Sequence, residues 1–211
     1  MAQKKRTRGC ELWLLLSVTL LSCHGTYFSR MVRTQGREHN VHVVIVGNGI
    51  AGVTTARHIR KRDASARITI VAGETDLHWS RPALMYVYMG HMRFQDTQPY
   101  SRAFFAKNRI HLLRGWVTEI NTVEKRLELD GQRSLSYDKL VLAVGSKPNR
   151  FGWPGQDLGR VHGMYSVQDL ASLEQLSSTV KHGAIVGGGL IGVELAEMLH
   201  VRGKHVTMLV R

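Results

Sequence analysis

Cysteine is nearly absent from this sequence of 211 residues, because its two cysteines are Cys10 and Cys23. The rest of the chain therefore cannot form a disulfide, a thiolate metal site or a cysteine nucleophile. Proline is also rare, with 4 residues, and the apolar residues, 43% of the total, occur in short runs. This composition is typical of a globular protein and excludes a collagen, a coiled coil and a low-complexity chain.

Acidic side chains are scarce as well, since 16 Asp and Glu stand against 29 Lys and Arg. Residues 41–211 contain 22 basic and 14 acidic residues, a net charge of +8. The basic residues, such as Arg57, Arg60 and Arg67, are scattered and not interleaved with aromatic residues. This pattern predicts a solvated basic surface that attracts anions such as nucleotides, and no nucleic-acid partner is expected.

Buried strands alternate with helices along the chain, which predicts an α/β fold with a parallel sheet. The apolar runs predict strands at 42–46, 67–71, 140–144, 184–186 and 205–210, and helices at 50–62, 100–108, 169–178 and 190–202. Residues 110–129 are expected to be β structure with a turn at 122–125. The Gly- and Pro-containing segment 145–168 is predicted to be a loop-rich connection.

Two glycine motifs of the form G-x-G-x-x-G each stand between a predicted strand and a predicted helix. The first consists of Gly47, Asn48, Gly49, Ile50, Ala51 and Gly52, and the second of Gly187, Gly188, Gly189, Leu190, Ile191 and Gly192. In this motif the first glycine allows a tight turn, the second admits a pyrophosphate to the backbone, and the third allows close helix–strand packing. The helix N-terminus then faces the phosphates. Two motifs in matched context predict two dinucleotides, with electron transfer between them.

From residue 41 onward the sequence resembles the FAD-dependent pyridine nucleotide reductases. The resemblance rests on VIVGNGIAG (44–52), SRPAL (80–84), SYDKLVLAVGSKP (136–148) and AIVGGGLIGVELAEML (184–199). It is strongest to the branch with rubredoxin and ferredoxin reductases, the nitrite reductase large subunit and the apoptosis-inducing-factor type. It implies two Rossmann-like domains around a three-layer parallel sheet, in a chain that is C-terminally incomplete.

The resemblance also implies a domain order and roles for individual residues. Residues 41–150 would be the first segment of the FAD domain, 151–180 a connection, and 181–211 the start of the NAD(P) domain. The first motif would hold FAD and the second NAD(P)H. Further FAD contacts are implied for Glu74, Arg81, Pro82, Val117, Ala143 and Gly145, and an NAD(P)H contact for Arg211.

The resemblance leaves alternatives open at two glutamates, Glu74 and Glu194. The ribose-binding acid of the family aligns with Gly73, so the ribose contact would come from Glu74 or from water. Glu194 matches an acid near the junction of nicotinamide and flavin, and it could instead be a first-turn glutamate favoured by the helix dipole.

The resemblance implies an NAD(P)H-dependent FAD oxidoreductase in which the cofactors carry the chemistry. Because the body lacks cysteine, dithiol and peroxidatic versions of the reaction are rejected. Electrons would leave for a small electron-acceptor protein, a quinone or oxygen, and the full-length form could be a homodimer. The alternative is an FAD- and NAD(P)H-binding regulatory protein with little turnover.

Residues 1–40 form a separate leader or extension. Four basic residues up to Arg8 precede the apolar residues 12–21, a stretch of signal-peptide length and too short to cross a bilayer comfortably. A signal with a lipoprotein-like box at 20–23 would anchor or export the protein, whereas a start at Met31 would make the segment an upstream extension. Cytoplasmic location is expected because reduced nicotinamide is found there.

The choice between NADH and NADPH yields a first prediction. About 20 residues past such a motif an NAD site places an acid on the ribose, and an NADP site avoids that charge. Here the position reads Val210, followed by Arg211, which could pair with a 2′-phosphate or be an ordinary surface residue. In the full-length protein, Arg211→Glu is expected to lower the NADPH-to-NADH ratio of kcat/KM several-fold. An unchanged ratio in steady-state assays would contradict this assignment.

Overall fold

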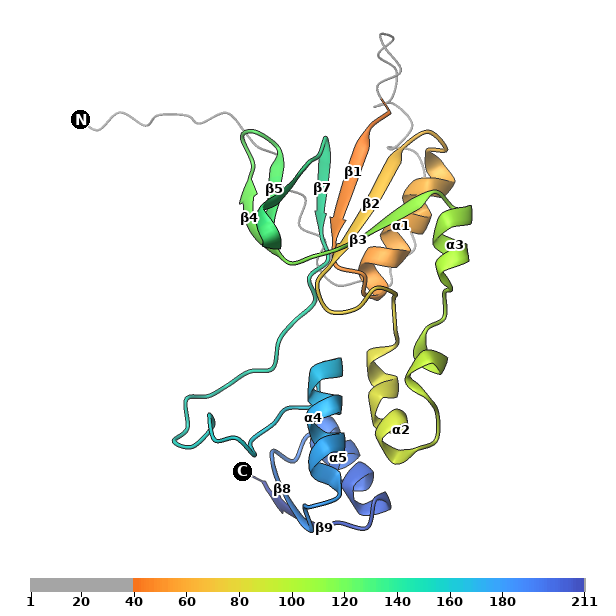
Figure 1. Ribbon diagram of the computed structural model, residues 1–211. Coiled ribbons are helices and arrows are strands. Elements are labelled where there is room, and N and C mark those ends of the chain that lie inside the picture. Colours follow the sequence, from red (N-terminus) through yellow and green to blue (C-terminus); the bar gives the residue numbers. More distant parts are fainter. Residues whose placement is uncertain (1–39, 211) are drawn as a thin grey trace, which may run out of the picture.

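The computed structural model describes residues 40–210 and contains a larger and a smaller α/β unit (Figure 1). The larger unit contains β1 (His42–Val46), α1 (Ile50–Arg62), β2 (Arg67–Ala72), α3 (Arg102–Lys107), β3 (Ile110–Arg114), β4 (Val117–Asn121), β5 (Arg126–Leu129), β6 (Arg133–Ser136) and β7 (Lys139–Leu142). The other elements are α2 (Leu84–Met89), α4 (Val167–Ser177), β8 (His182–Val186), α5 (Leu190–Val201), β9 (His205–Leu209), and the 3-10 turns η1 (Arg81–Ala83), η2 (Phe94–Thr97) and η3 (Asp130–Gln132).

The centre of the larger unit is a four-stranded parallel sheet in the order β3-β2-β1-β7. Helices α1 and α3 cover one face of this sheet, and Val43 and Ile45 of β1 pack against them. Val44, between these two residues, faces the other side and packs with Leu127 and Leu129 of β5. Because both faces are covered, the run of apolar residues in β1 is continuous and does not alternate.

The cover on the second face is an antiparallel sheet in the order β4-β5-β6. The predicted turn at 122–125 is present, since Asn121 Oδ1 accepts hydrogen bonds from the amides of Val123 and Glu124. The predicted β segment 110–129 is nevertheless divided between two sheets. Its first strand, β3, joins the parallel sheet, and β4 begins the antiparallel one after Gly115 and Trp116. The strand β6 was not predicted.

The smaller unit repeats the β1-α1-β2 arrangement with β8, α5 and β9, in which β8 and β9 pair in parallel. Its helices α4 and α5 pack against α2, which lies between β2 and β3 in the sequence. Trp79, Tyr88, Leu170 and Met198 are buried in this cluster. The cluster therefore joins a segment of the predicted FAD domain to the predicted connection and NAD(P) domain, whose boundaries remain predictions.

The bounds of α1 agree with the prediction, and those of α3, α4 and α5 differ from it by at most two residues. Capping side chains determine where α3 and α4 begin. Ser101 accepts a hydrogen bond from the amide of Phe104 and starts α3 at Arg102. Ser166 and Asp169 form a capping box that starts α4 at Val167, where the sequence predicted 169. No helix within residues 40–210 is long and apolar enough to cross a membrane. The predicted leader and Arg211 lie outside the described residues.

The contact between α1 and the loop before it yields a stability prediction. A Cβ at Gly52 would lie 1.9 Å from the carbonyl oxygen of Gly47, so Gly52→Ala requires a backbone shift. We expect a loss of about 2 kcal/mol in unfolding free energy, measured by urea denaturation. Gly49→Ala is the matched control, because a Cβ there meets nothing within 4 Å. Equal stability of the two variants would contradict the prediction.

Candidate functional site

The first glycine loop, residues 47–52, connects the end of β1 to the start of α1. Gly47 has φ of +111°, and a Cβ there would lie 2.2 Å from the carbonyl oxygen of Ala143. Its amide donates to the carbonyl of Val71 at the end of β2, with 2.8 Å between N and O. Gly47 and Gly52 are therefore required by the protein's own packing, as the motif predicts.

Gly49 is not required in the same way. Its φ of −68° and ψ of −177° are open to any residue, and a Cβ would meet nothing within 4 Å. No side chain caps the start of α1, so its first amides have no side-chain acceptor. The space next to Gly49 and these amides suit an external anion such as a pyrophosphate.

The second glycine loop, residues 187–192, repeats this geometry. Gly187 has φ of +120°, its amide donates to Leu209 at 2.9 Å, and a Cβ at Gly192 would lie 2.1 Å from the Gly187 carbonyl oxygen. Gly189 again has an extended backbone and nothing within 4 Å of a Cβ. The side chains that follow the middle glycines are exposed, namely Ile50, Ala51, Leu190 and Ile191.

The first loop is anchored by the side chain of Asn48, a residue of the predicted motif, and by His78, which the sequence did not reveal. Asn48 Nδ2 donates to the carbonyl of Thr75 at 2.9 Å, and the Asn48 carbonyl lies 2.9 Å from Nδ1 of His78. His78 is 5% exposed, and burial lowers its pKa below the ordinary value. Neutral His78 can therefore donate Nδ1–H to the loop. Its only signal in the sequence is its position between Glu74 and Arg81.

The structure brings Glu74 and Arg81 together at 2.8 Å. The other carboxylate oxygen of Glu74 accepts from the amide of Val167 at 3.1 Å, at the start of α4. The Arg81 guanidinium lies between the rings of Trp79 and Tyr165, 4.5 and 4.1 Å from their centroids, and donates to the Tyr165 carbonyl. Both carboxylate oxygens of Glu74 thus have protein partners, and its ribose role remains a prediction.

The remaining predicted FAD residues lie near the carboxyl end of the sheet. Ala143 donates to Val46 at 2.8 Å and passes directly beside Gly47. Gly145 follows with φ of +71°, close to the Tyr165 hydroxyl. Pro82 is exposed in η1, and Val117 is half-buried at the start of β4.

One alternative for Glu194 is wrong. Helix α5 begins at Leu190 and has no acidic residue in its first turn, so Glu194 lies beyond it. The field of the helix terminus is strong only within that turn and does not explain an acid there. Glu194 is half-buried, and its role near the nicotinamide remains a prediction.

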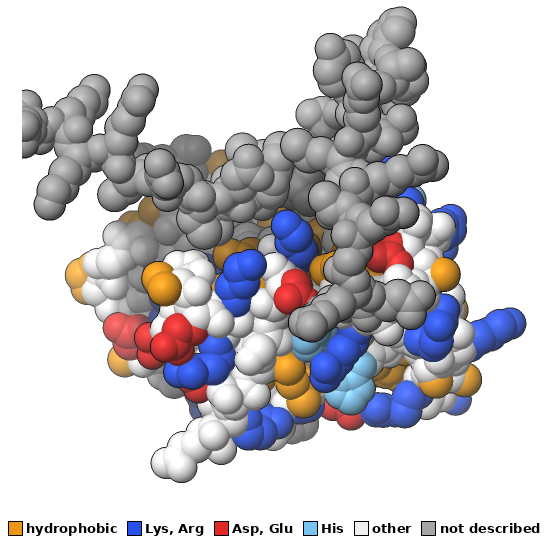
Figure 2. Space-filling model, turned by 90° about the horizontal axis from the view of Figure 1, so that it is seen from above, with side chains coloured by type: hydrophobic (Ala, Val, Ile, Leu, Met, Phe, Trp, Pro, Cys, Tyr) orange, Lys and Arg blue, Asp and Glu red, His pale blue; other side chains and the backbone are white. Residues whose placement is uncertain are grey.

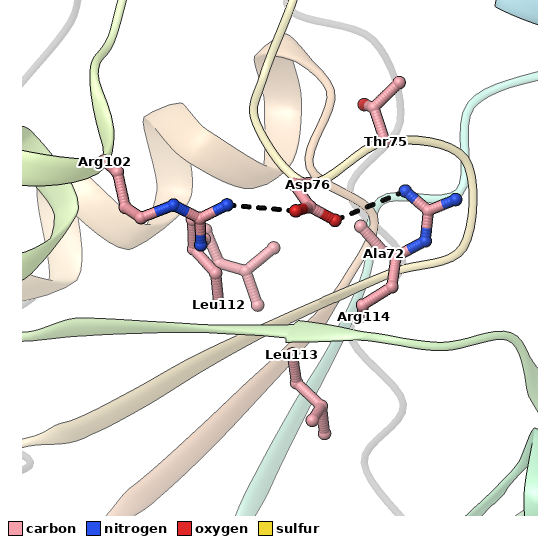
Figure 3. A pocket seen from close by; sticks show the side chains of 8 residues that line it. Ala72, Thr75, Asp76, Arg102, Leu112, Leu113 and Arg114 are labelled. Atoms are coloured by element: carbon pink, nitrogen blue, oxygen red, sulfur yellow. Dashed lines mark hydrogen bonds and ion pairs between the residues drawn. The ribbon is translucent and has the colours of Figure 1, made fainter.

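A pocket that the sequence did not indicate lies at the carboxyl ends of β2 and β3 (Figure 3). Asp76 lies between Arg102, at 2.9 Å, and Arg114, at 3.5 Å. All three side chains are more than half exposed, so these ion pairs add little stability. They leave one excess positive charge beside Ala72, near the first glycine loop.

The basic residues are distributed as the sequence predicts. Figure 2 shows Lys and Arg spread over the face seen from above, with acidic and hydrophobic side chains between them. Several arginines are bound locally, as Arg60 is by the carbonyls of Asn108 and Arg109. Among the described residues visible in this view, Lys and Arg side chains are separated by white, acidic and hydrophobic ones.

Comparisons with known proteins identify the family of this chain. Residues 41–211 match the family described as pyridine nucleotide-disulphide oxidoreductase. The chain is 32% identical over 169 residues to the ferredoxin–NAD(+) reductase subunit of the benzene 1,2-dioxygenase system from Pseudomonas putida, with 80% of this chain and 41% of the relative covered. It is 34% identical to the nitric oxide reductase FlRd-NAD(+) reductase of Escherichia coli O9:H4, with 79% and 44% covered.

Solved structures of reductases have a similar fold. A ferredoxin reductase from Rhodopseudomonas palustris matches with a TM-score of 0.73 and 26% identity, covering 80% of this chain and 42% of that one. The covalent complex of putidaredoxin reductase and putidaredoxin matches with a TM-score of 0.71 and 29% identity, again covering 80% and 42%. The chain thus spans less than half the length of these curated relatives and solved structures.

The buried histidine yields a pH prediction. Because burial places the pKa of folded His78 below its ordinary value of 6.5, the unfolded state takes up the proton first as pH falls. The stabilisation by neutral His78 is complete above pH 6.5 and is lost below it. We expect His78→Asn, which keeps a donor near the Nδ1 position, to reduce the fall in unfolding free energy between about pH 7 and 5.

The control for this experiment is His42, whose pKa is also lowered by burial and by Arg67. It lies at the start of β1, with Nε2 2.9 Å from Thr69 Oγ1. His42→Gln should remove a separate part of the pH dependence, and the double variant should remove both. An unchanged slope for His78→Asn in urea titrations would refute the assignment.

Proposed function

Because the chain belongs to the pyridine nucleotide-disulphide oxidoreductase family, we propose that it is part of an NAD(P)H-dependent FAD oxidoreductase. In this proposal residues 47–52 bind FAD and residues 187–192 bind NAD(P)H. The observation that carries it is the pair Gly49 and Gly189, two glycines that the fold itself does not need. Each leaves open space at an uncapped helix start, which is where a pyrophosphate requires the absence of a side chain.

The residues present fit FAD along the first loop. The amides at the start of α1 can bind the pyrophosphate, and Asn48 and His78 keep the loop in place from behind. Arg81 is fixed by Glu74 and lies over the ring of Tyr165, whose hydroxyl is close to Gly145 at the end of the predicted flavin segment. A cation whose position is set by protein contacts suits an electron-accepting ring that gains negative charge.

The chain itself contributes to the reaction by holding the two dinucleotides in position. When bound, FAD supplies the two-electron chemistry that accepts a hydride from a reduced nicotinamide. The two glycine loops bind the phosphates, and tight binding at both ends favours a reactive geometry. We assign Glu194 to the nicotinamide side of the junction, because it lies in α5 just after the second loop.

The electron acceptor in this proposal is a small electron-transfer protein. It is supported by two similar proteins, one a ferredoxin–NAD(+) reductase subunit and one crystallised in a complex with putidaredoxin. A quinone or oxygen is the alternative acceptor, and the full-length protein could act as a homodimer. Ferricyanide and a quinone would serve as test acceptors beside a ferredoxin.

The two middle glycines provide the test of this function. In the full-length protein, Gly49→Ala should weaken FAD binding about tenfold or more, because a methyl group displaces the pyrophosphate from charge-assisted amide contacts. Gly189→Ala should weaken NADH and NADPH binding and leave FAD binding unchanged. Each variant thus serves as the control for the other, with Kd values from flavin absorbance and nicotinamide titration.

With no nucleotide bound, both variants should keep the melting temperature of the wild type, because neither Cβ meets another atom within 4 Å. A wild-type protein that binds no FAD would refute the proposal. Unchanged Kd values in both variants would show that the loops serve only the fold.

A further inference from the structure

The end of β2 lacks the acid that a dinucleotide fold normally uses there. About 20 residues after the glycine motif, an Asp or Glu usually hydrogen-bonds the ribose 2′-hydroxyl of the bound nucleotide. Here β2 ends at Ala72, and the next residue is Gly73. The neighbouring Glu74 is paired with Arg81 and accepts from the amide of Val167. Neither position therefore presents a free carboxylate.

An indole ring occupies the place of that missing side chain. A Cβ built on Gly73 would lie 2.2 Å from Cδ2, 2.5 Å from Cε2 and 2.7 Å from Cε3 of Trp116. Cδ2 and Cε2 are the two atoms shared by the indole rings, and Cε3 is bonded to Cδ2, so the indole lies directly over the Gly73 backbone. Any side chain at position 73 would displace it. The observed position of the Trp116 ring thus requires glycine at position 73.

Trp116 is held in place by its backbone, although its side chain is 61% exposed. Its carbonyl accepts from the amide of Asp130 at 2.9 Å, and the amide of Gly115 donates to Ala72 at 3.0 Å. The protein therefore fixes a large apolar surface at the carboxyl end of β2 and leaves most of it in water. The exposed part of the indole is therefore available to stack on a flat group of a ligand.

The position of Trp116 matches one end of the predicted FAD site. Gly47 of the first loop is hydrogen-bonded to Val71, two residues before Gly73 on the same strand. In this fold ligands bind beyond the carboxyl ends of the strands, and the adenosine of a dinucleotide extends from the glycine loop toward the second strand. The indole is thus beside the space that an adenosine on this loop would occupy.

We propose that Trp116 binds the adenosine of FAD by stacking, in place of the usual carboxylate–ribose hydrogen bond. This inference rests on the proposed FAD binding at residues 47–52. Stacking on an indole is worth about 1–3 kcal/mol per base and does not depend on the ribose hydroxyl. The site should therefore bind adenosine groups with and without the 2′-hydroxyl equally well.

The first test compares FAD with FMN, which lacks the adenosine. In the full-length protein, Trp116→Thr should raise the Kd for FAD about fivefold or more and leave that for FMN unchanged, whereas Trp116→Phe should keep most of the FAD affinity. The matched control is Trp153→Thr, which removes a 49% exposed tryptophan that stacks on Phe151. This control should bind both flavins as the wild type does.

The second test uses displacement of bound FAD by ADP and 2′-deoxy-ADP. The wild type should respond equally to both, and Gly73→Glu combined with Trp116→Thr should restore preference for ADP. An unchanged FAD affinity in Trp116→Thr, or an equal loss for FAD and FMN, would overturn the stacking role. Wild-type protein without FAD binding would instead overturn the proposed function, which separates the two failures.

Discussion

The close approach of a helix to the strand before it is the constraint on which both units depend. At Gly52 and again at Gly192 the Cα lies so near the carbonyl of the loop's first glycine that a methyl group would not fit. This contact fixes where α1 and α5 begin and how their axes leave the sheet. Because the helix start is fixed and uncapped, its first amides remain available at the carboxyl end of the strands. A packing contact thus creates the candidate anion site.

The sequence predicts the parts of the fold that depend on local pattern. The continuous apolar runs at β1 and β2 indicate strands buried on both faces, and the spacing of Gly47, Gly49 and Gly52 predicts the turn between them. The division of residues 110–129 was missed, because Gly115 and Trp116 do not interrupt the β pattern. The chain changes sheets there through long-range contacts, such as the bond from Gly115 to Ala72.

The sequence predicts the backbone positions of the candidate site, such as its glycines. It does not predict which residues the side chains of the site contact. Glycine positions follow from sterics that a motif encodes, whereas the partners of Glu74 depend on where α4 begins. His78 and Trp116 are likewise visible only when distant segments are placed together. Glu194 shows a different error. The predicted helix start at residue 190 agrees with the structure, but Glu194 is the fifth residue of α5 and lies beyond the first turn, where the field of the helix terminus is strong.

The two glycine loops have the same backbone conformation and differ in the side chains that contact them from behind. In the first loop Asn48 is fixed on one side by Thr75 and on the other by His78, both from the segment after β2. In the second loop Gly188 has no side chain, and a Cβ there would meet Val210 at 2.7 Å. A loop that is already ordered by side-chain hydrogen bonds loses less conformational entropy when a ligand binds. Two copies of one motif can therefore bind chemically similar dinucleotides with different strength, because the difference comes from the residues behind the loop.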